Sequence, residues 1–155
     1  MSASLENGQG EAQWVVVQPG LFQYPLAAEE KPALLAARCC QCRRVFFPKR
    51  RLCPTCFSTE MEDIRIRGRG LIYSAAVVHI SSPSGIAAPY AYGYVDMEDE
   101  DVRVFGLFSG DRPESFSAGR DVELAVGPVS TDNLGRQVIG YQFVPVLKPG
   151  DPPGD

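Results

Sequence analysis

The alternation of apolar and polar residues predicts a chain of short β-strands from residue 64 onward. Apolar side chains recur at every second position or in short runs, and glycine, proline and small polar residues interrupt them at each expected turn. A short helical turn is predicted only around residues 113–116. Five to six strands over about 85 residues are typical of a small closed or half-closed barrel such as an OB-fold. The predicted strands are 64–67, 71–80, 90–97, 102–108, 122–126 and 138–144.

The chain before residue 64 follows another pattern. Residues 14–26 form an apolar arm that two prolines and a glycine interrupt, so one long helix is excluded. Residues 27–38 fit either a short helix or an extended lead-in strand. An arm with this many large apolar side chains needs a surface to pack on, and we expect Trp14, Phe22 and Tyr24 to anchor it on a larger partner protein.

Four cysteines form two matched pairs, Cys39-x-x-Cys42 and Cys53-x-x-Cys56, with ten residues between them. Two tight turns at this spacing present two thiolates each to one tetrahedral Zn²⁺ ion. Four thiolates leave no coordination position for water, so the predicted zinc is structural, with one ion per chain. Two disulfides are the alternative, which a cytoplasmic location disfavours. A redox function is less favoured than zinc binding, because a redox site needs only one Cys-x-x-Cys motif. The fifth cysteine, Cys40, is interpreted as a spare thiol.

Composition sets the broad class. With 155 residues, 45% of them hydrophobic and 22% charged, the chain has the make-up of one globular domain or of a small module fused to one. No apolar run approaches the roughly 18 residues of a membrane-spanning helix, so no membrane association is expected. The first ten residues lack the pattern of a signal peptide, and we expect a cytoplasmic protein. The tail at 148–155 is expected to be disordered.

A net charge of −4 conceals a basic segment. Residues 31–70 hold ten of the fifteen basic residues and three acids, a local balance of +7. The loop between the cysteine pairs is either a solvated hairpin whose Phe46 or Phe47 packs on the barrel, or a rigid loop that meets phosphate groups, because arginine forks pair bidentately with phosphate oxygens. We call it the basic loop. Its five cations are Arg43, Arg44, Lys49, Arg50 and Arg51.

Neither catalysis by the chain alone nor nucleic-acid binding is favoured. The one histidine, His79, ends an apolar predicted strand and is interpreted as structural, and the acids at 96–101 are interpreted as a solvated turn. A single-stranded nucleic-acid module is the alternative from another class, because Tyr90, Tyr92 and Tyr94 alternate on one strand as a stacking platform would. That strand leads into the acidic turn, which repels a phosphate backbone, so we interpret the tyrosines as barrel surface or partner contact.

Taken together, these motifs resemble the acyl-CoA-associated zinc-ribbon plus OB-fold proteins. The resemblance spans residues 38–146. Arg43 departs from the pattern, because family members usually carry glycine after the second cysteine. The matching segments are Arg38-Cys39-x-x-Cys42 through Phe46-Phe47-Pro48-Lys49-Arg50, Cys53-Pro54-x-Cys56, Gly68-x-Gly70-x-Ile72-Tyr73-Ser74, Pro89-Tyr90 and Tyr141-Gln142-Phe143-x-Pro145.

The resemblance implies a non-catalytic partner of thiolase-fold enzymes in a hetero-oligomer. Ribbon and OB-fold would pack against the thiolase and help to hold coenzyme A or acyl-CoA, with the basic loop near the phosphates. One candidate branch is aromatic degradation, such as the zinc-finger subunit of benzoylsuccinyl-CoA thiolase, where an aromatic 3-oxoacyl-CoA is cleaved. A scaffold that bridges two enzymes without touching ligand stays open. The expected organisation is a leader and docking arm at 1–37, a zinc ribbon at 38–63, an OB-fold at 64–147 and the tail at 148–155.

Overall fold

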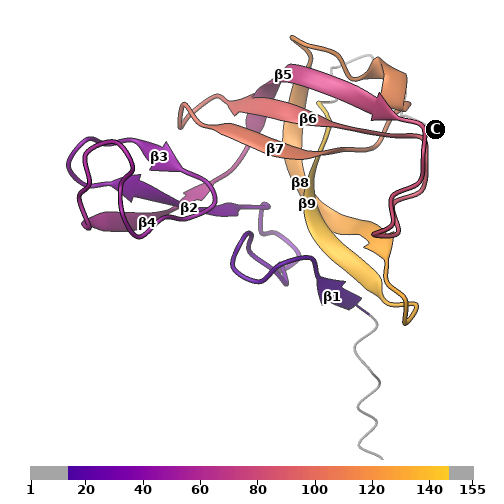
Figure 1. Ribbon diagram of the computed structural model, residues 1–155, viewed down its shortest axis with the longest axis horizontal. Coiled ribbons are helices and arrows are strands. Elements are labelled where there is room, and N and C mark those ends of the chain that lie inside the picture. Colours follow the sequence, from indigo (N-terminus) through magenta and orange to yellow (C-terminus); the bar gives the residue numbers. More distant parts are fainter. Residues whose placement is uncertain (1–13, 147–155) are drawn as a thin grey trace, which may run out of the picture.

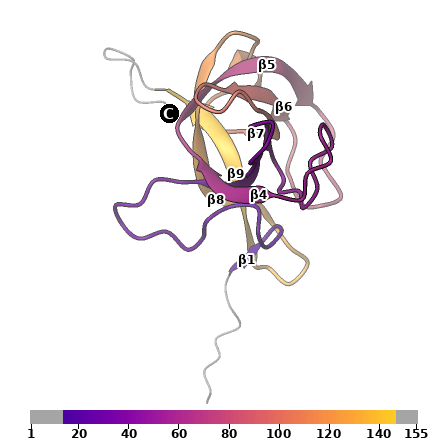
Figure 2. The same cartoon turned by 90° about the vertical axis from the view of Figure 1, so that its left-hand side faces the viewer.

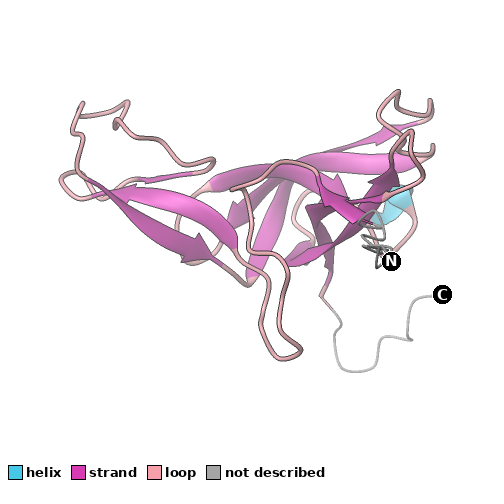
Figure 3. Ribbon diagram, turned by 90° about the horizontal axis from the view of Figure 1, so that it is seen from below, coloured by secondary structure: helices cyan, strands magenta, loops and turns pink. Residues whose placement is uncertain are grey.

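A computed structural model describes residues 14–146 of the protein, and the expectations for the leader before residue 14 and for the tail fall outside this range. Within it the chain forms nine strands and one 3₁₀ turn. The strands build a small three-stranded ribbon beside a barrel (Figure 1), and strands and loops make up nearly all of the molecule (Figure 3). No helix in the described range has the length and apolarity needed to cross a membrane.

Five strands form the barrel. Around the barrel the order is β5-β6-β7-β9-β8, and β8 pairs back to β5, which closes the ring. The β7–β9 pair is parallel and the other barrel pairs are antiparallel. Closure leaves no free barrel edge, and the five-stranded barrel confirms the predicted OB-fold. The strands are β5 (Arg69–Val78), β6 (Tyr90–Met97), β7 (Arg103–Phe108), β8 (Asp121–Thr131) and β9 (Gln137–Pro145).

Alternate residues of these strands fill the barrel. Val95, Val104, Val122 and Phe143 are fully buried, whereas their sequence neighbours face outward. Gly106 leaves room for the Phe143 ring of the neighbouring strand, because a Cβ at this glycine would lie 2.7 Å from that ring. The 3₁₀ turn η1 (Pro113–Ser115) is followed by Phe116, which stacks on Phe108 with 5.1 Å between ring centroids. The interior is therefore a packed core.

The ribbon is an antiparallel sheet in the order β3-β2-β4. Its strands are β2 (Leu34–Cys39), β3 (Val45–Phe46) and β4 (Met61–Ile66). Of the two alternatives for 27–38, the strand is the one observed, from residue 34 on. Leu34, Ala36 and Ile66 belong to the same buried cluster as the barrel core, so the base of the ribbon is anchored in the barrel. In Figure 2 the ribbon lies in front of the barrel.

The arm packs on the protein itself. Its strand β1 (Trp14–Val16) pairs in parallel with the start of β9. Phe22 forms a β-bridge with Leu34 and is only 6% exposed. Tyr24 lies edge-on to Trp14 with ring centroids 4.9 Å apart, and Trp14 remains 40% exposed. Phe22 thus contributes to internal packing that the sequence interpretation did not include, and partner contact through Trp14 and Tyr24 stays a prediction.

Candidate metal centre and basic groove

Two knuckles with the same backbone hydrogen bonds hold the four paired cysteines. In the first, the Arg43 amide donates to the Cys39 carbonyl at 3.0 Å, and in the second the Phe57 amide donates to the Cys53 carbonyl at 2.9 Å. The amides of Cys39 and Cys53 donate to carbonyls five residues further on, both at 2.9 Å. The residues after the second cysteines, Arg43 and Phe57, have φ values of 67° and 63°. Glycine prefers this left-handed region, which accounts for the usual family residue at Arg43.

The four sulfur atoms are spaced for a metal ion. Sγ of Cys39 lies 3.5 Å from that of Cys56, Sγ of Cys42 lies 3.6 Å from that of Cys53, and all four lie within 4.8 Å of one another. Tetrahedral zinc with Zn–S bonds of about 2.3 Å requires sulfurs about 3.8 Å apart. A disulfide would require about 2.05 Å, and all of these cysteines are free thiols. Donor set and spacing fit one structural Zn²⁺, which would hold the two knuckles together.

The knuckle amides favour thiolate at the first cysteine of each pair. The amide of Cys42 lowers the pKa of Cys39. Burial raises the pKa of Cys53, but amide hydrogen bonds led by that of Cys56 outweigh it and lower the pKa to about 6. Although an amide from Ser58 acts in the opposite direction, the neighbouring Cys39 sulfur and burial raise the pKa of Cys56 to about 11. Metal binding to this set therefore displaces protons from the second cysteines.

Two residues considered from the sequence lie apart from this centre. Cys40 is exposed and lies outside the sulfur cluster, as a spare thiol should. His79 is exposed just after the end of β5, and its interpretation as a structural histidine stays a prediction. The apolar centre of the basic loop does pack on the barrel, because the Phe47 ring lies 5.5 Å from that of Tyr141, edge to face.

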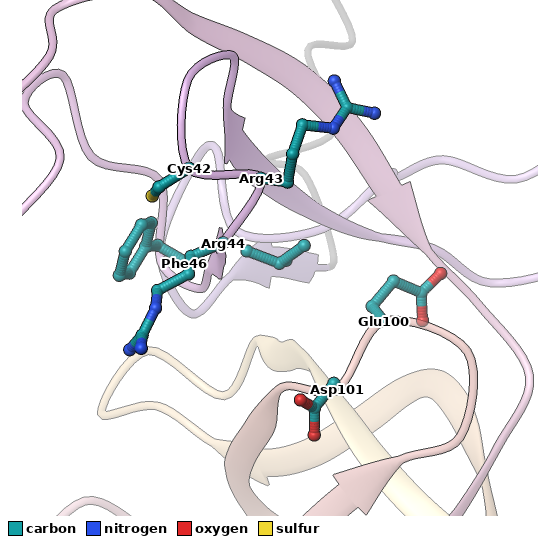
Figure 4. A pocket seen from close by; sticks show the side chains of 7 residues that line it. Cys42, Arg43, Arg44, Phe46, Glu100 and Asp101 are labelled. Atoms are coloured by element: carbon teal, nitrogen blue, oxygen red, sulfur yellow. The ribbon is translucent and has the colours of Figure 1, made fainter. Parts of the chain in front are cut away.

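The five cations of the basic loop fall into different environments. Arg43 pairs with Glu62 at 3.5 Å, and Lys49 pairs with Asp63 at 3.1 Å, so two of them are held by acids of β4. Arg44 lines a pocket of about 360 Å³ that Glu100 and Asp101 close from the β6–β7 turn (Figure 4). The acidic turn thus faces the ribbon, and burial, followed by the charge of Asp99, raises the pKa of Glu100.

A groove along the ribbon collects the remaining cations. Two adjoining hollows of about 370 and 610 Å³ share Lys49 and Asp63. Apolar side chains and cations line them, and the one acid, Asp63, is already paired with Lys49. Sequence reasoning missed Arg65, which stands on β4 outside the basic loop and whose only signal was the alternation of arginines along the predicted strand. The lining residues are Leu35, Lys49, Arg50, Arg51, Thr59, Met61, Asp63, Ile64 and Arg65.

Family descriptions match both parts of the chain. A "ChsH2, rubredoxin-like zinc ribbon domain" matches residues 26–62, and a "ChsH2, C-terminal OB-fold domain" matches residues 63–127. The chain belongs to the ChsH2 zinc-ribbon and OB-fold family. This confirms the resemblance inferred from the motifs. The exact domain limits and the assignment of the individual zinc ligands stay predictions.

This ChsH2 family member is similar to a named enzyme subunit, to a named scaffold protein and to a solved structure. A benzoylsuccinyl-CoA thiolase subunit, BbsA, of Thauera aromatica is 36% identical over 81% of this chain and 84% of its own length. A DUF35 domain-containing scaffold protein of Methanocaldococcus jannaschii is 34% identical over 76% of this chain and 85% of its own length. Among solved structures, an Ltp2-ChsH2(DUF35) aldolase matches with a TM-score of 0.60 and 25% identity, covering 73% of this chain and 84% of the other.

Proposed function

We propose that the protein is a non-catalytic subunit of a thiolase-type acyl-CoA enzyme complex, in which it docks on the thiolase subunit and helps to form the coenzyme A site. The 36% identical relative named as a thiolase subunit supports the thiolase class, and cleavage of an aromatic 3-oxoacyl-CoA such as benzoylsuccinyl-CoA is the candidate reaction of the complex. An independent catalytic role has little support, because the four clustered cysteines would complete a metal shell and leave no open coordination position.

The basic groove is the observation that carries the ligand part of the proposal. Coenzyme A combines anionic phosphates with a long, mostly apolar pantetheine arm. The groove offers cations beside an apolar floor of Leu35, Met61 and Ile64. In the described residues, Arg50 and Arg51 form no ion pair with the protein, so their charge is available to a phosphate, whereas Arg43 and Lys49 must share theirs with acids of β4. Arg44 shares its pocket with the carboxylates of Glu100 and Asp101 and is the less favourable phosphate contact.

Zinc would give the basic loop its rigidity. Four thiolates from two knuckles fix both ends of residues 43–52, so binding a ligand orders little further backbone. The zinc would thereby contribute to ligand affinity without touching the ligand.

A pure scaffold is the second candidate function, and the 34% identical relative named as a scaffold protein favours it. In a scaffold the cations of the groove would be solvated and would leave the kinetics of the partner unchanged.

Steady-state kinetics of the complex separate these two functions. The protein is reconstituted with its candidate thiolase-fold partner subunit, and Lys49, Arg50, Arg51 and Arg65 are replaced singly by alanine. Loss of a charge-assisted hydrogen bond of about 1.5 kcal/mol should raise the KM for acyl-CoA roughly tenfold while assembly stays intact. Arg50→Ala, Arg51→Ala and Arg65→Ala should have larger effects than Lys49→Ala, since Lys49 shares its charge with Asp63 and the three arginines form no ion pair in the described residues. Arg112→Ala, an exposed cation beside the 3₁₀ turn, is the matched control.

Two results would decide against the proposal in different ways. Unchanged kinetics in all four intact complexes would leave the scaffold function. Thiolase activity of the chain without any partner would contradict the non-catalytic role altogether.

A further inference from the structure

Exposed aromatic side chains form a cluster on the outer face of β6 and β7. Tyr94 and Phe105 are direct cross-strand partners with ring centroids 5.4 Å apart, and the Tyr92 ring lies at the same distance from Phe105. Tyr94 is 45% exposed and Phe105 47% exposed. Figure 1 shows β5, β6 and β7 side by side along the top of the barrel. Because side chains alternate between the two faces of a strand, this row stands opposite the buried core positions.

An ion pair extends the row onto β5. Arg103 donates two hydrogen bonds to the Asp96 carboxylate, from Nε at 2.7 Å and from Nη2 at 3.1 Å. Its guanidinium carbon lies 3.4 Å from the centroid of the Tyr73 ring. Asp96 lies two residues after Tyr94, and Arg103 lies two residues before Phe105, so the pair shares the face of the aromatic row. We call this continuous surface the aromatic face; its members are Leu71, Tyr73, Tyr92, Tyr94, Asp96, Arg103 and Phe105.

The aromatic face is large enough for the core of a protein interface. Four of its side chains are each about half exposed, and at about 200 Å² for a fully exposed large side chain they present on the order of 400 Å² of surface. This lies within the size range of the largest apolar patch on a typical monomer, which is often functional. It is also about half of the roughly 800 Å² that each partner buries in a standard complex. The four are Leu71, Tyr73, Tyr94 and Phe105.

The chemistry of the aromatic face favours a protein as its occupant. Its one cation, Arg103, is committed to Asp96 and stacked on Tyr73, so no member offers a free positive charge. Single-stranded nucleic acid needs such charges beside its stacking platform. Interface cores between proteins are instead rich in tyrosine, phenylalanine and arginine and poor in unpaired charge. The fitting partner surface is neutral and largely apolar, with hydrogen-bond acceptors for the tyrosine hydroxyls.

We infer that the aromatic face is the main docking surface for the acyl-CoA enzyme subunit, an inference that rests on the proposed function. The face lies on the strands that end and begin at the β6–β7 turn, and Glu100 and Asp101 of this turn line a pocket together with the first knuckle. A subunit docked on the aromatic face is therefore placed to reach the ribbon as well. This continuity joins the docking surface to the domain that carries the basic groove.

Charge insertion tests the inference. Tyr94→Glu and Phe105→Glu are made in the full chain, and the affinity for the candidate thiolase-fold partner subunit is measured by calorimetry. A carboxylate in the core of an interface should weaken binding roughly thirtyfold or more. Tyr94→Phe should weaken binding much less than Tyr94→Glu, because it removes only one hydroxyl and keeps the ring. Leu134→Glu is the matched control, because Leu134 is 74% exposed on the β8–β9 turn and lies outside the aromatic face. Thermal unfolding checks that each variant is folded.

Each further outcome has one meaning. If the wild type binds the subunit and both folded glutamate variants bind equally well, the inference is wrong and the proposed function stands. If the wild type does not bind, both fail. A dimer of the chain alone that Tyr94→Glu dissociates would assign the aromatic face to a second copy, and a short thymidine oligonucleotide that binds the wild type but not Phe105→Glu would assign it to nucleic acid. Either result overturns the inference.

Discussion

At the scale of single residues, Arg43 and Phe57 place unrelated side chains in the same backbone position. Both follow the second cysteine of a knuckle, and both have positive φ. A side chain in the left-handed region is disfavoured by about 1–2 kcal/mol relative to glycine. The sequence drew attention to Arg43 only through the family pattern, and nothing marked Phe57. Backbone conformation of this kind is visible only once the hydrogen bonds of the knuckle are known.

Arg43→Gly should therefore stabilise the zinc-loaded protein. The change relieves the disfavoured φ and removes a solvent-exposed ion pair with Glu62 that contributes little. After allowing for the greater freedom of glycine in the unfolded chain, the free energy of unfolding should rise by about 0.5–1 kcal/mol in denaturant titrations. Arg43→Ala is the control, since it removes the guanidinium and keeps the backbone conformation. A glycine variant no more stable than the alanine variant would contradict this account.

The cations show what single-residue reasoning from sequence cannot reach. All five basic residues between the cysteine pairs looked alike in the sequence. In the structure, acids on β4 hold two of them, and two others remain without an ion pair in the groove. The acids Glu62 and Asp63 lie well beyond the loop along the chain, so only the folded β2–β4 pairing brings them close. Arg65 was missed for the same reason, because only the folded β2–β4 pairing places it in the groove.

At the scale of elements, hydrophobic alternation located every barrel strand, and the largest difference lies in β8. Residues 127–136 were expected to form a loop because they contain glycine, proline and serine, yet β8 continues to Thr131 opposite β9. A register shift between Pro128 and Ser130 accommodates the proline, and Gly140 on β9 leaves room for the side chain of Val129. Turn-forming residues inside a bulged strand look like a loop until the pairing is known. The short β1 and β3 had no periodic signal.

The arm gives a prediction at this scale, because one of its aromatics is buried and another is exposed. Phe22→Ala should lower the free energy of unfolding by about 3 kcal/mol, since its ring lies in the shared core. Trp14→Ala should affect stability less and should weaken binding to the enzyme subunit if the arm also contacts it, as predicted from the sequence. Denaturant titration and affinity measurement on the same two variants separate these roles. A Trp14→Ala protein with unchanged affinity would confine the arm to internal packing.

At the scale of the whole molecule, ribbon and barrel share one core but differ in what stabilises them. The base of the ribbon is buried with the barrel through Leu34, Ala36 and Ile66. Beyond Cys39, in the stretch of residues 40–60, Cys53 is the sole buried hydrophobic residue. Too little apolar area is buried there to offset the entropy of ordering the chain, so the knuckles must depend on the metal.

Metal loss should accordingly unfold one end of the molecule and spare the other. Cys53→Ser removes one of four predicted ligands, so metal analysis should find zinc far below one ion per chain, and amide-exchange protection should fall across residues 39–60. Protection of the barrel strands should persist, because their core contains no ligand. Cys40→Ser is the control and should keep stoichiometric zinc, since this thiol lies outside the cluster. Stoichiometric zinc with full thermal stability in Cys53→Ser would refute the ligand assignment, and collapse of barrel protection would show that zinc stabilises the whole fold.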